Sequence, residues 1–288
     1  MKKEPAGFRE PAVAGRFYPG EASALRDQVQ RCLAWKPDPP TTPATSGAAD
    51  PERVVAVVVP HAGYDYSGGV AGAVYAATTL PRLLVILCPN HTGLGRPVAM
   101  MNRGVWRTPL GDAVVDEELA DRILQTSSLV ELDDRAHRDE HSLEVQLPFL
   151  QVRMEEFTFV PLCVGGLGLP ALIRLGHDLS RAIRDSDRPT GLVISSDMSH
   201  YIPAGEARRK DMMAVERIAA LDPEGLHQVV ETMDISMCGI APAVAGLTAA
   251  HDAGARHARL VAYANSGDSS GDYEKVVGYA GLAIPCQA

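Results

Sequence analysis

The sequence lacks the features that mark several large classes of protein. Its five cysteines are odd in number and none are at CxxC spacing, which argues against a disulfide framework and a zinc finger. Acidic residues outnumber basic ones by 36 to 27, so a net charge of −9 provides no basic face for nucleic acid or a membrane surface. No apolar run approaches the ~20 residues of a membrane span. Residues 1–5 lack the apolar core of a signal peptide. We therefore expect a cytoplasmic protein with reduced thiols that binds neither nucleic acid nor membrane.

Nucleotide-binding loops are missing as well. Glycine pairs occur at 165–166 and at positions 93 and 95. Neither pair is followed by the Lys-Ser/Thr of a P-loop, and neither has the full spacing of a dinucleotide-binding loop. The sequence therefore favours neither kind of nucleotide site.

What the sequence does contain is a series of short apolar runs separated by helical patterns. Unbroken β-branched runs indicate strands that are buried on both faces, as in a parallel sheet with helices on each side. The predicted strands are 54–59, 83–88, 157–164, 191–195, 258–264 and 275–284, the last two forming an antiparallel edge. The predicted helices are 22–33, 69–79, 116–125, 170–184, 211–221 and 223–231, together with one that opens at 139–142 and one that is introduced by 237–242 and runs to about residue 250. This alternation predicts an α/β fold.

Two of the apolar runs end in the same way, with a proline and then a histidine. The run at 54–59 leads through a proline to His61, and the run at 83–88 leads through Pro-Asn to His91. Proline cannot donate to a sheet ladder, so each strand should stop there. In an open parallel sheet, ligands bind beyond the carboxyl ends of the strands. His61 alone could equally be a capped strand-end residue, but the repetition at His91 indicates a shared cleft.

A third strand end and a helix start add further chemistry. The run at 191–195 leads into Asp197 and His200, and Cys238 lies at the start of the helix predicted to reach residue 250. A helix N-terminus favours the thiolate, the form of cysteine that binds metals. Two imidazoles with one anionic ligand are the usual composition of an open mononuclear metal site. Sulfur together with nitrogen suits iron, copper or zinc better than magnesium.

Several of these residues have a simpler interpretation. His141 could cap the helix that opens at Asp139, and Asp197 could cap a helix starting near Met198. Cys238 could be a small buried hydrophobic residue. The Ser-Ser-Asp-x-x-His context makes a supporting or acid–base role for Asp197 at least as reasonable as a cap.

The other cysteines and histidines are predicted to be structural or solvated. Cys88 and Cys163 lie inside apolar runs and are expected in the core. Five histidines occur in charged or helical-surface settings and are expected to be solvated: His137, His177, His227, His251 and His257.

Six segments make up a joint pattern that none of them carries alone. They are REPAVAGRFY at 9–18, PHAGYDYSG at 60–68, NHTG at 90–93, DEHSLE at 139–144, SSDMSH at 195–200 and CG at 238–239. In this order the segments resemble the Memo family, whose prokaryotic members are often called AmmeMemoRadiSam system protein B. The resemblance covers nearly the whole chain.

The resemblance implies a fold and a set of site residues. The implied fold is a single α/β domain over 1–288, with a central, mostly parallel sheet flanked by helices, similar to the LigB-like (class III extradiol) non-haem iron dioxygenases. Residues 38–51, rich in proline and threonine, are expected to form a surface loop. Carried over position by position, the metal ligands of the family fall on His61, His91 and Cys238. Asp197 and His200 would line the same pocket, with His141 nearby.

Two functional hypotheses follow from the residues and the resemblance. The first is a metal-dependent redox protein that holds iron, or copper or zinc, with His200 as general acid or base oriented by Asp197. Because Cys238 matches a position where the dioxygenases have a carboxylate, aromatic ring cleavage is not implied. The alternative is a non-catalytic binding module whose cleft captures a peptide or protein partner. The family name points to radical-SAM and AMMECR-like proteins as partners.

Overall fold

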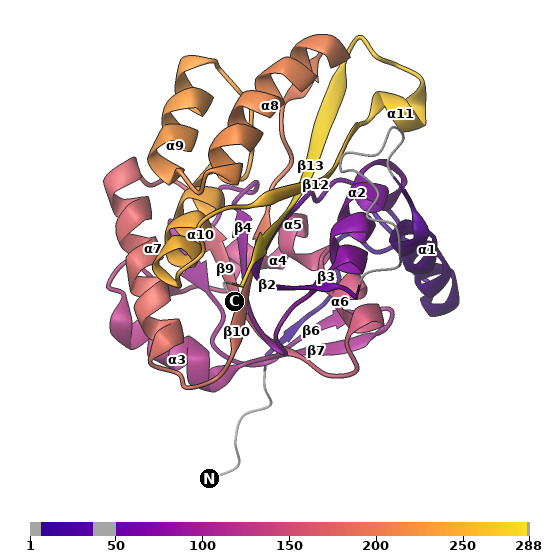
Figure 1. Ribbon diagram of the computed structural model, residues 1–288. Helices are drawn as coiled ribbons and strands as arrows, with labels where there is room; N and C mark the ends of the chain where they lie inside the picture. The colour runs from indigo at the N-terminus through magenta and orange to yellow at the C-terminus, as the bar shows by residue number, and fades with distance from the viewer. Residues whose placement is uncertain (1–6, 37–49, 287–288) are drawn as a thin grey trace.

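The predicted apolar runs form the centre of one mixed β-sheet (Figure 1). The computed structural model of the chain describes residues 7–36 and 50–286. In that part of the chain the sheet has 13 strands, and its main path runs β1-β6-β7-β9-β4-β10-β2-β13-β11. The strands are β1 (Phe8–Arg9), β2 (Glu52–Val59), β3 (Thr78–Thr79), β4 (Leu83–Pro89), β5 (Val98–Met100), β6 (Val105–Thr108), β7 (Gly111–Val115), β8 (Glu131–Leu132), β9 (Thr158–Val164), β10 (Thr190–Ser195), β11 (His200–Ile202), β12 (Arg259–Asn265) and β13 (Val276–Pro285).

Four neighbouring strands, β9, β4, β10 and β2, run parallel at the centre of the sheet. In register, Val193 of β10 lies between Ile86 of β4 and Val57 of β2. Every residue of β4 is buried, as expected for a parallel strand covered on both faces. Because these strands are parallel and adjacent, their carboxyl ends lie at one edge of the sheet.

Helices cover both faces of this sheet (Figure 1). They are α1 (Ala22–Ala34), α2 (Tyr64–Ala77), α3 (Glu117–Thr126), α4 (Arg135–Arg138), α5 (His141–Glu144), α6 (Leu147–Arg153), α7 (Leu169–Arg184), α8 (Ala204–Ala219), α9 (Pro223–Thr232), α10 (Ile240–Asp252) and α11 (Gly267–Ser270). Side chains alternate along β4: Leu83, Val85 and Leu87 join the core under α3, α7 and α10. Leu84 and Ile86 join the core under α1, α2 and α6.

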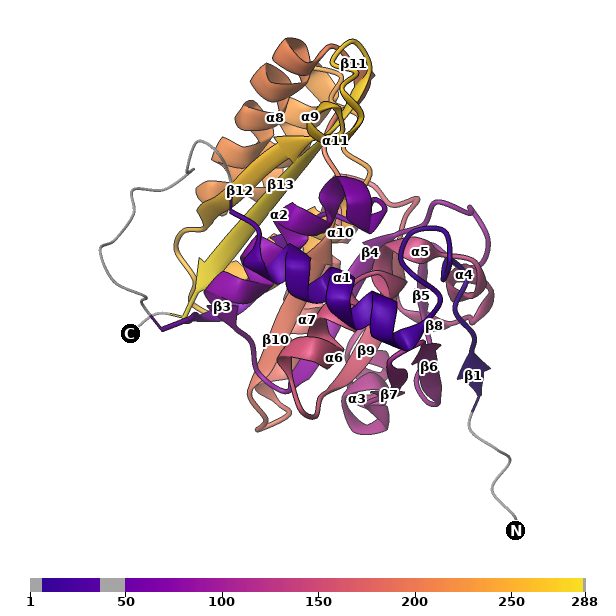
Figure 2. The same ribbon diagram turned by 90° about the vertical axis from the view of Figure 1, so that its right-hand side faces the viewer.

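The predicted antiparallel pair at the C-terminal end of the described chain is confirmed, and it extends the sheet. β12 pairs antiparallel with β13, and β13 pairs antiparallel with β2. In Figure 2 this long pair rises beyond the parallel strands, with α8 alongside it. The loop that follows β10 turns back here, because His200 of β11 pairs with Val277 of β13. The alternative in which Asp197 caps a helix near Met198 is excluded, since residues 196–199 carry no helix.

Two helices begin earlier than predicted. α2 begins at Tyr64 rather than residue 69, and α8 begins at Ala204 rather than residue 211. The small residues of α2 allow close packing against α1, since a Cβ on Gly72 would lie 2.2 Å from the Cys32 carbonyl oxygen. Small residues there serve helix–helix contact as well as contact with the sheet.

Most of the predicted 38–51 loop lies outside the described residues. Its last two residues, Asp50 and Pro51, carry neither helix nor strand. Among the described residues, no helix has the length and apolar character needed to cross a membrane.

Candidate metal centre

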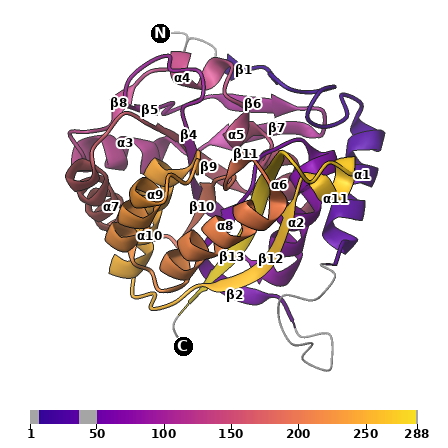
Figure 3. The same cartoon turned by 90° about the horizontal axis from the view of Figure 1, so that it is seen from above.

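Three adjacent strand ends carry the predicted site residues to one edge of the sheet. His61 follows β2, His91 follows β4, and Asp197 follows β10, which lies between them. Seen from above, α5 lies next to β4 near this edge (Figure 3). The convergence follows directly from the parallel register of the three strands.

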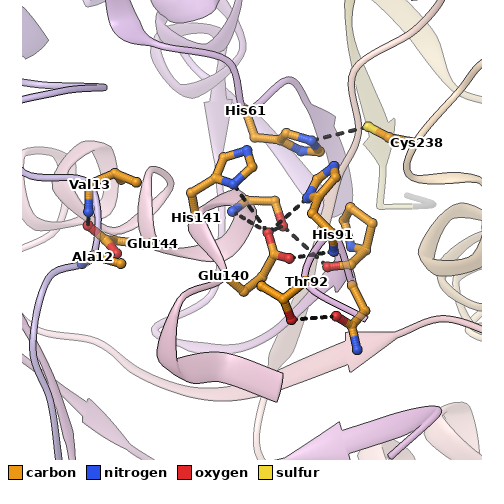
Figure 4. Close-up of polar contacts among 12 residues, drawn as sticks. Ala12, Val13, His61, His91, Thr92, Glu140, His141, Glu144 and Cys238 are labelled. Carbon is orange, nitrogen blue, oxygen red and sulfur yellow. Dashed lines mark hydrogen bonds and ion pairs between the residues drawn. The ribbon is translucent and has the colours of Figure 1, made fainter. Parts of the chain in front are cut away.

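His61, His91 and Cys238 form a compact donor group. One ligand atom from each residue lies within 4.8 Å of the others. Cys238 Sγ is 3.2 Å from His61 Nε2, and the His61 and His91 ring centroids are 5.2 Å apart (Figure 4). These separations suit three ligands of one ion, since metal–ligand bonds of about 2.0–2.3 Å place neighbouring ligand atoms about 3–4 Å apart.

Cys238 reaches the strand ends because the residue after it is glycine. Gly239 is the N-cap of α10, and its N–H donates to Ser196 Oγ at 3.1 Å. A Cβ on Gly239 would lie 2.3 Å from Ser196 Cβ. Any larger residue would push the start of α10, and Cys238 with it, away from β10.

The protonation state of Cys238 differs from the sequence prediction. Burial raises the pKa of the Cys238 thiol, and the Asp197 carboxylate raises it further. Cys238 precedes the N-cap and is half-buried, and desolvation outweighs the helix dipole. Without a metal ion the residue is therefore a thiol at neutral pH.

Glu140 holds His91 through two separate contacts. Its Oε1 is 2.9 Å from His91 Nδ1, and its Oε2 accepts the His91 backbone N–H at 2.6 Å. The same carboxylate accepts from the Ser142 backbone and hydroxyl at 2.9 and 2.6 Å. Burial alone would raise the pKa of Glu140, but His91 and Ser142 lower it to about 2. Glu140 is therefore ionised, and His91 Nδ1 donates to it.

The pKa of His91 responds to the same contact. Burial would lower the pKa of His91, but the hydrogen bond and charge of Glu140 outweigh it and raise the pKa. Because Nδ1 is bound to Glu140, Nε2 is the ring nitrogen left for a metal. A carboxylate behind the second nitrogen is the usual support of a histidine ligand.

His141 lies against the same histidines. Its ring stacks on His91 with centroids 4.8 Å apart, and its Nδ1 is 3.5 Å from Glu140 Oε1 (Figure 4). Burial lowers the pKa of His141 to about 4, so the ring is neutral at neutral pH. Phe17 covers it from the N-terminal segment at 4.7 Å. His141 is the first residue of α5, and Glu140 rather than His141 is the N-cap.

The N-terminal segment is held in place by Glu144, which is fully buried. Glu144 forms an ion pair with the buried Arg9, and accepts the backbone N–H groups of Ala12 and Val13 at 2.8 and 3.1 Å. It also accepts the Tyr18 hydroxyl at 2.5 Å. This one carboxylate thus fixes the segment that brings Phe17 to the site.

His61 and Asp197 are buried side by side. Asp197 Oδ1 accepts the His61 backbone N–H at 2.7 Å, and Oδ2 lies 4.0 Å from His61 Nε2. Burial, then the neighbouring His141 and His91, lowers the pKa of His61 well below its usual value. Burial raises the pKa of Asp197 to about 7. Asp197 can therefore hold or release a proton near neutral pH.

His200 has different partners from those predicted. Its backbone N–H donates to Ser236 Oγ at 2.7 Å, and its Nδ1 lies 2.9 Å from the Ser236 carbonyl oxygen. A carbonyl can only accept, so Nδ1 carries the hydrogen and Nε2 is free. Ser236, and not Asp197, orients His200; the side chain of Asp197 binds His61 instead. His200 is near enough to the cluster to lower the pKa of His61.

Comparison with known proteins identifies the family. The model of the family described as "Memo-like protein" matches residues 9–283. The chain belongs to the Memo family.

Relatives support this assignment over nearly the whole of the Memo chain. A MEMO1 family protein of Methanopyrus kandleri is 43% identical over 280 residues, covering 96% of this chain and 98% of that protein. MEMO1 family proteins of Methanothermobacter thermautotrophicus and Aquifex aeolicus are each 40% identical, over 96% and 95% of this chain and 100% and 98% of theirs. A crystal structure of an uncharacterized Escherichia coli K12 protein superposes with a TM-score of 0.53 at 16% identity. It covers 79% of this chain and 99% of that one, and supports the fold alone.

The Memo chain also contains site features that sequence reasoning missed. Glu140, which holds His91, is not among the predicted site residues, although its position beside His141 was a signal for a histidine-binding group. His137 was predicted to be solvated, which is wrong: it is fully buried. Its Nε2 is 3.1 Å from the Ala99 carbonyl oxygen, and its own carbonyl accepts Arg9 Nε at 3.0 Å. Cys88 and Cys163 are fully buried, as predicted.

Proposed function

We propose that this Memo family protein is a metal-dependent redox protein whose iron or copper ion is held by His61, His91 and Cys238. The observation that carries the proposal is the grouping of their ligand atoms within 4.8 Å. The donor set fits such an ion, because two imidazoles and a sulfur suit iron, copper or zinc better than magnesium or calcium. Glu140 supports His91 as histidine ligands are usually supported.

A second grouping, His91 with Glu140 and His141, is a weaker candidate for the same ion. Its atoms also lie within 4.8 Å of one another. However, the Glu140 carboxylate already accepts four hydrogen bonds, two from His91 and two from Ser142. Coordination by Glu140 would break several of them, whereas His61, His91 and Cys238 can bind without breaking the contacts of Glu140.

When bound, the ion would supply one-electron redox chemistry and, with three protein ligands, coordination positions open to a substrate. Binding at Cys238 displaces the thiol proton, so metal uptake releases a proton and strengthens as pH rises. Asp197 is buried with its Oδ2 4.0 Å from His61 Nε2, where it could take up a proton, and His200 presents a free Nε2. These two groups are our proposed acid–base pair, acting separately. His141 and Phe17 would form the wall that limits access of water.

The experiment is metal analysis after anaerobic purification, combined with an oxygen-consumption assay. The wild type is compared with His61→Ala and Cys238→Ser. His177→Ala and Cys286→Ser are matched controls, since both residues are exposed and outside the group. We expect about one equivalent of iron or copper in the wild type and both controls, and a loss of at least tenfold in the two site variants. Equal, substoichiometric metal in all five proteins would refute the proposal.

A further inference from the structure

Ser195 lies at the centre of a buried hydrogen-bond network beside His61. Its hydroxyl donates to the Ser142 carbonyl oxygen at 2.7 Å, and its oxygen accepts Gln146 Nε2–H at 3.1 Å. His61 Nδ1 lies 2.8 Å from the same oxygen. Ser195 and its two other partners, Ser142 and Gln146, are fully buried, and His61 is 1% exposed. Bulk water therefore does not compete for these contacts.

The donors and acceptors around Ser195 Oγ fix the hydrogen on His61. A serine hydroxyl has one hydrogen to donate and two lone pairs. Its hydrogen is directed to the Ser142 carbonyl, which can only accept, and one lone pair receives the Gln146 amide. The remaining lone pair faces His61 Nδ1, so Nδ1 carries the hydrogen. A buried carbonyl would lose its donor if the hydroxyl turned toward His61 instead, at a cost of about 1–3 kcal/mol.

The side-chain amide of Gln146 is fixed in the orientation that donates a hydrogen bond to Ser195. Its Nε2 also donates to the Pro60 carbonyl oxygen at 3.0 Å, and its Oε1 accepts the Tyr75 hydroxyl at 3.0 Å. A turned amide would place its oxygen against the Pro60 carbonyl, where two acceptors face each other. Gln146 is therefore a fixed donor to Ser195.

The contact of His61 Nε2 with Cys238 is consistent with a hydrogen on Nδ1. With the hydrogen on Nδ1, His61 Nε2 has a free lone pair directed at Cys238, whose Sγ lies 3.2 Å away. In the metal-free protein the thiol can donate to this lone pair. A metal ion would displace the hydrogen of the Cys238 thiol and would bind to the lone pair of His61 Nε2.

We propose that Ser195 is a positioning residue that holds His61 in the Nδ1–H tautomer, so that Nε2 always faces the metal position. The two histidines are then preset by different partners, His91 by the Glu140 carboxylate and His61 by a neutral hydroxyl. The role of this tautomer in metal binding rests on the proposed function. The tautomer itself is a property of the metal-free chain and can be measured without a metal.

The test is nitrogen NMR of histidine-labelled, metal-free protein at neutral pH, with the His61 signals assigned by their loss in His61→Gln. The wild type should show one His61 tautomer, with the hydrogen on Nδ1. Ser195→Ala should give a mixture or the Nε2–H form, and Ser195→Thr, which keeps the hydroxyl, should restore the wild-type pattern. Ser199→Ala is the matched control, because Ser199 is equally buried but its hydroxyl donates to Asp211.

Metal titration of the same proteins provides the second readout. Ser195→Ala should weaken metal affinity about 10- to 100-fold, and Ser199→Ala should leave it within about threefold of the wild type. A wild-type His61 with its hydrogen on Nε2 would overturn the proposal without any variant, as would a Ser195→Ala protein with the wild-type tautomer. If the tautomer is as stated but the wild type binds no metal, the proposed function fails and the role of Ser195 in setting the tautomer stands.

Discussion

Glu140→Gln should destabilise the protein by about 3 kcal/mol at neutral pH. On folding, the pKa of the carboxyl falls from 4.5 to about 2, and this shift corresponds to about 3 kcal/mol. The hydrogen bonds lost in the variant give a cost of similar size. Glutamine keeps one acceptor oxygen, so if that oxygen stays with His91 Nδ1 and Ser142, the His91 backbone N–H loses its partner. An orphaned buried N–H costs about 1–3 kcal/mol, and the remaining bonds lose their charge.

The pH dependence of this effect has a definite sign. The folded pKa of Glu140 is below the unfolded value, so its contribution is complete above pH 4.5 and is lost as pH falls toward about 2. The gap between wild type and Glu140→Gln should therefore narrow as the solution is acidified. The assay is urea unfolding followed by circular dichroism from neutral pH to about pH 3.

Glu118→Gln is the matched control for Glu140→Gln. Glu118 also forms ion pairs, at 3.6 Å to Arg188 and 3.7 Å to Arg122, but its side chain is 64% exposed. Exposed pairs contribute under about 1 kcal/mol. The reasoning is refuted if Glu140→Gln is within 1 kcal/mol of the wild type, or if its deficit is the same at all pH values.

Three further perturbations test the surroundings of the site. Glu144→Ala leaves the buried Arg9 charge without its partner, and should cost about 3–5 kcal/mol in urea unfolding; a loss below 1 kcal/mol would contradict the buried ion pair. Gly239→Ala places a Cβ 2.3 Å from Ser196 Cβ, and should lower both the melting temperature and metal content, whereas unchanged metal content would show that α10 can shift freely. Burial lowers the pKa of His137 from 6.5 to about 4, so the neutral, buried ring contributes about 3 kcal/mol of stability that is lost as pH falls from 6.5 to 4. In His137→Phe the unfolding free energy should therefore fall less steeply over this pH range than in the wild type. An equally steep fall in the variant would argue against a neutral, buried His137.

The parallel strands and the grouping of the site could be predicted from the sequence because both depend on local patterns. Runs such as 54–59 are too apolar for a half-exposed strand, which fixes a sheet buried on both faces. A proline ends the apolar run ahead of both His61 and His91, so the two histidines follow ends of parallel strands. Once those strands are parallel, the two residues must lie at one edge.

The partners of the site residues could not be predicted, because they depend on contacts between distant segments. His200 looked like a partner of Asp197, three residues away, but the chain turns into β11 between them and Ser236 takes that place. His137 lies in a charged stretch, yet it is fully buried, with its ring against Trp106 and its carbonyl bound by Arg9 of the N-terminal segment. Local sequence carries no signal for packing of this kind.

The prediction that Cys238 is a thiolate failed for an energetic reason. The position of Cys238 at a helix start was identified correctly, and a helix dipole does favour a thiolate. The dipole contributes at most about 2 kcal/mol, whereas burial of a charged group costs more. Burial is a property of the whole fold, so the sign of the pKa shift became clear only from the structure.

The most direct test of the proposed metal centre is X-ray absorption spectroscopy of the protein loaded with one equivalent of zinc as a probe, with Cys238→Ser measured alongside. The ligand set of His61, His91 and Cys238 predicts one sulfur at about 2.3 Å and two imidazole nitrogens at about 2.0–2.1 Å, with the sulfur lost in the variant. A wild-type spectrum with only oxygen and nitrogen neighbours, or one unchanged by Cys238→Ser, would contradict it.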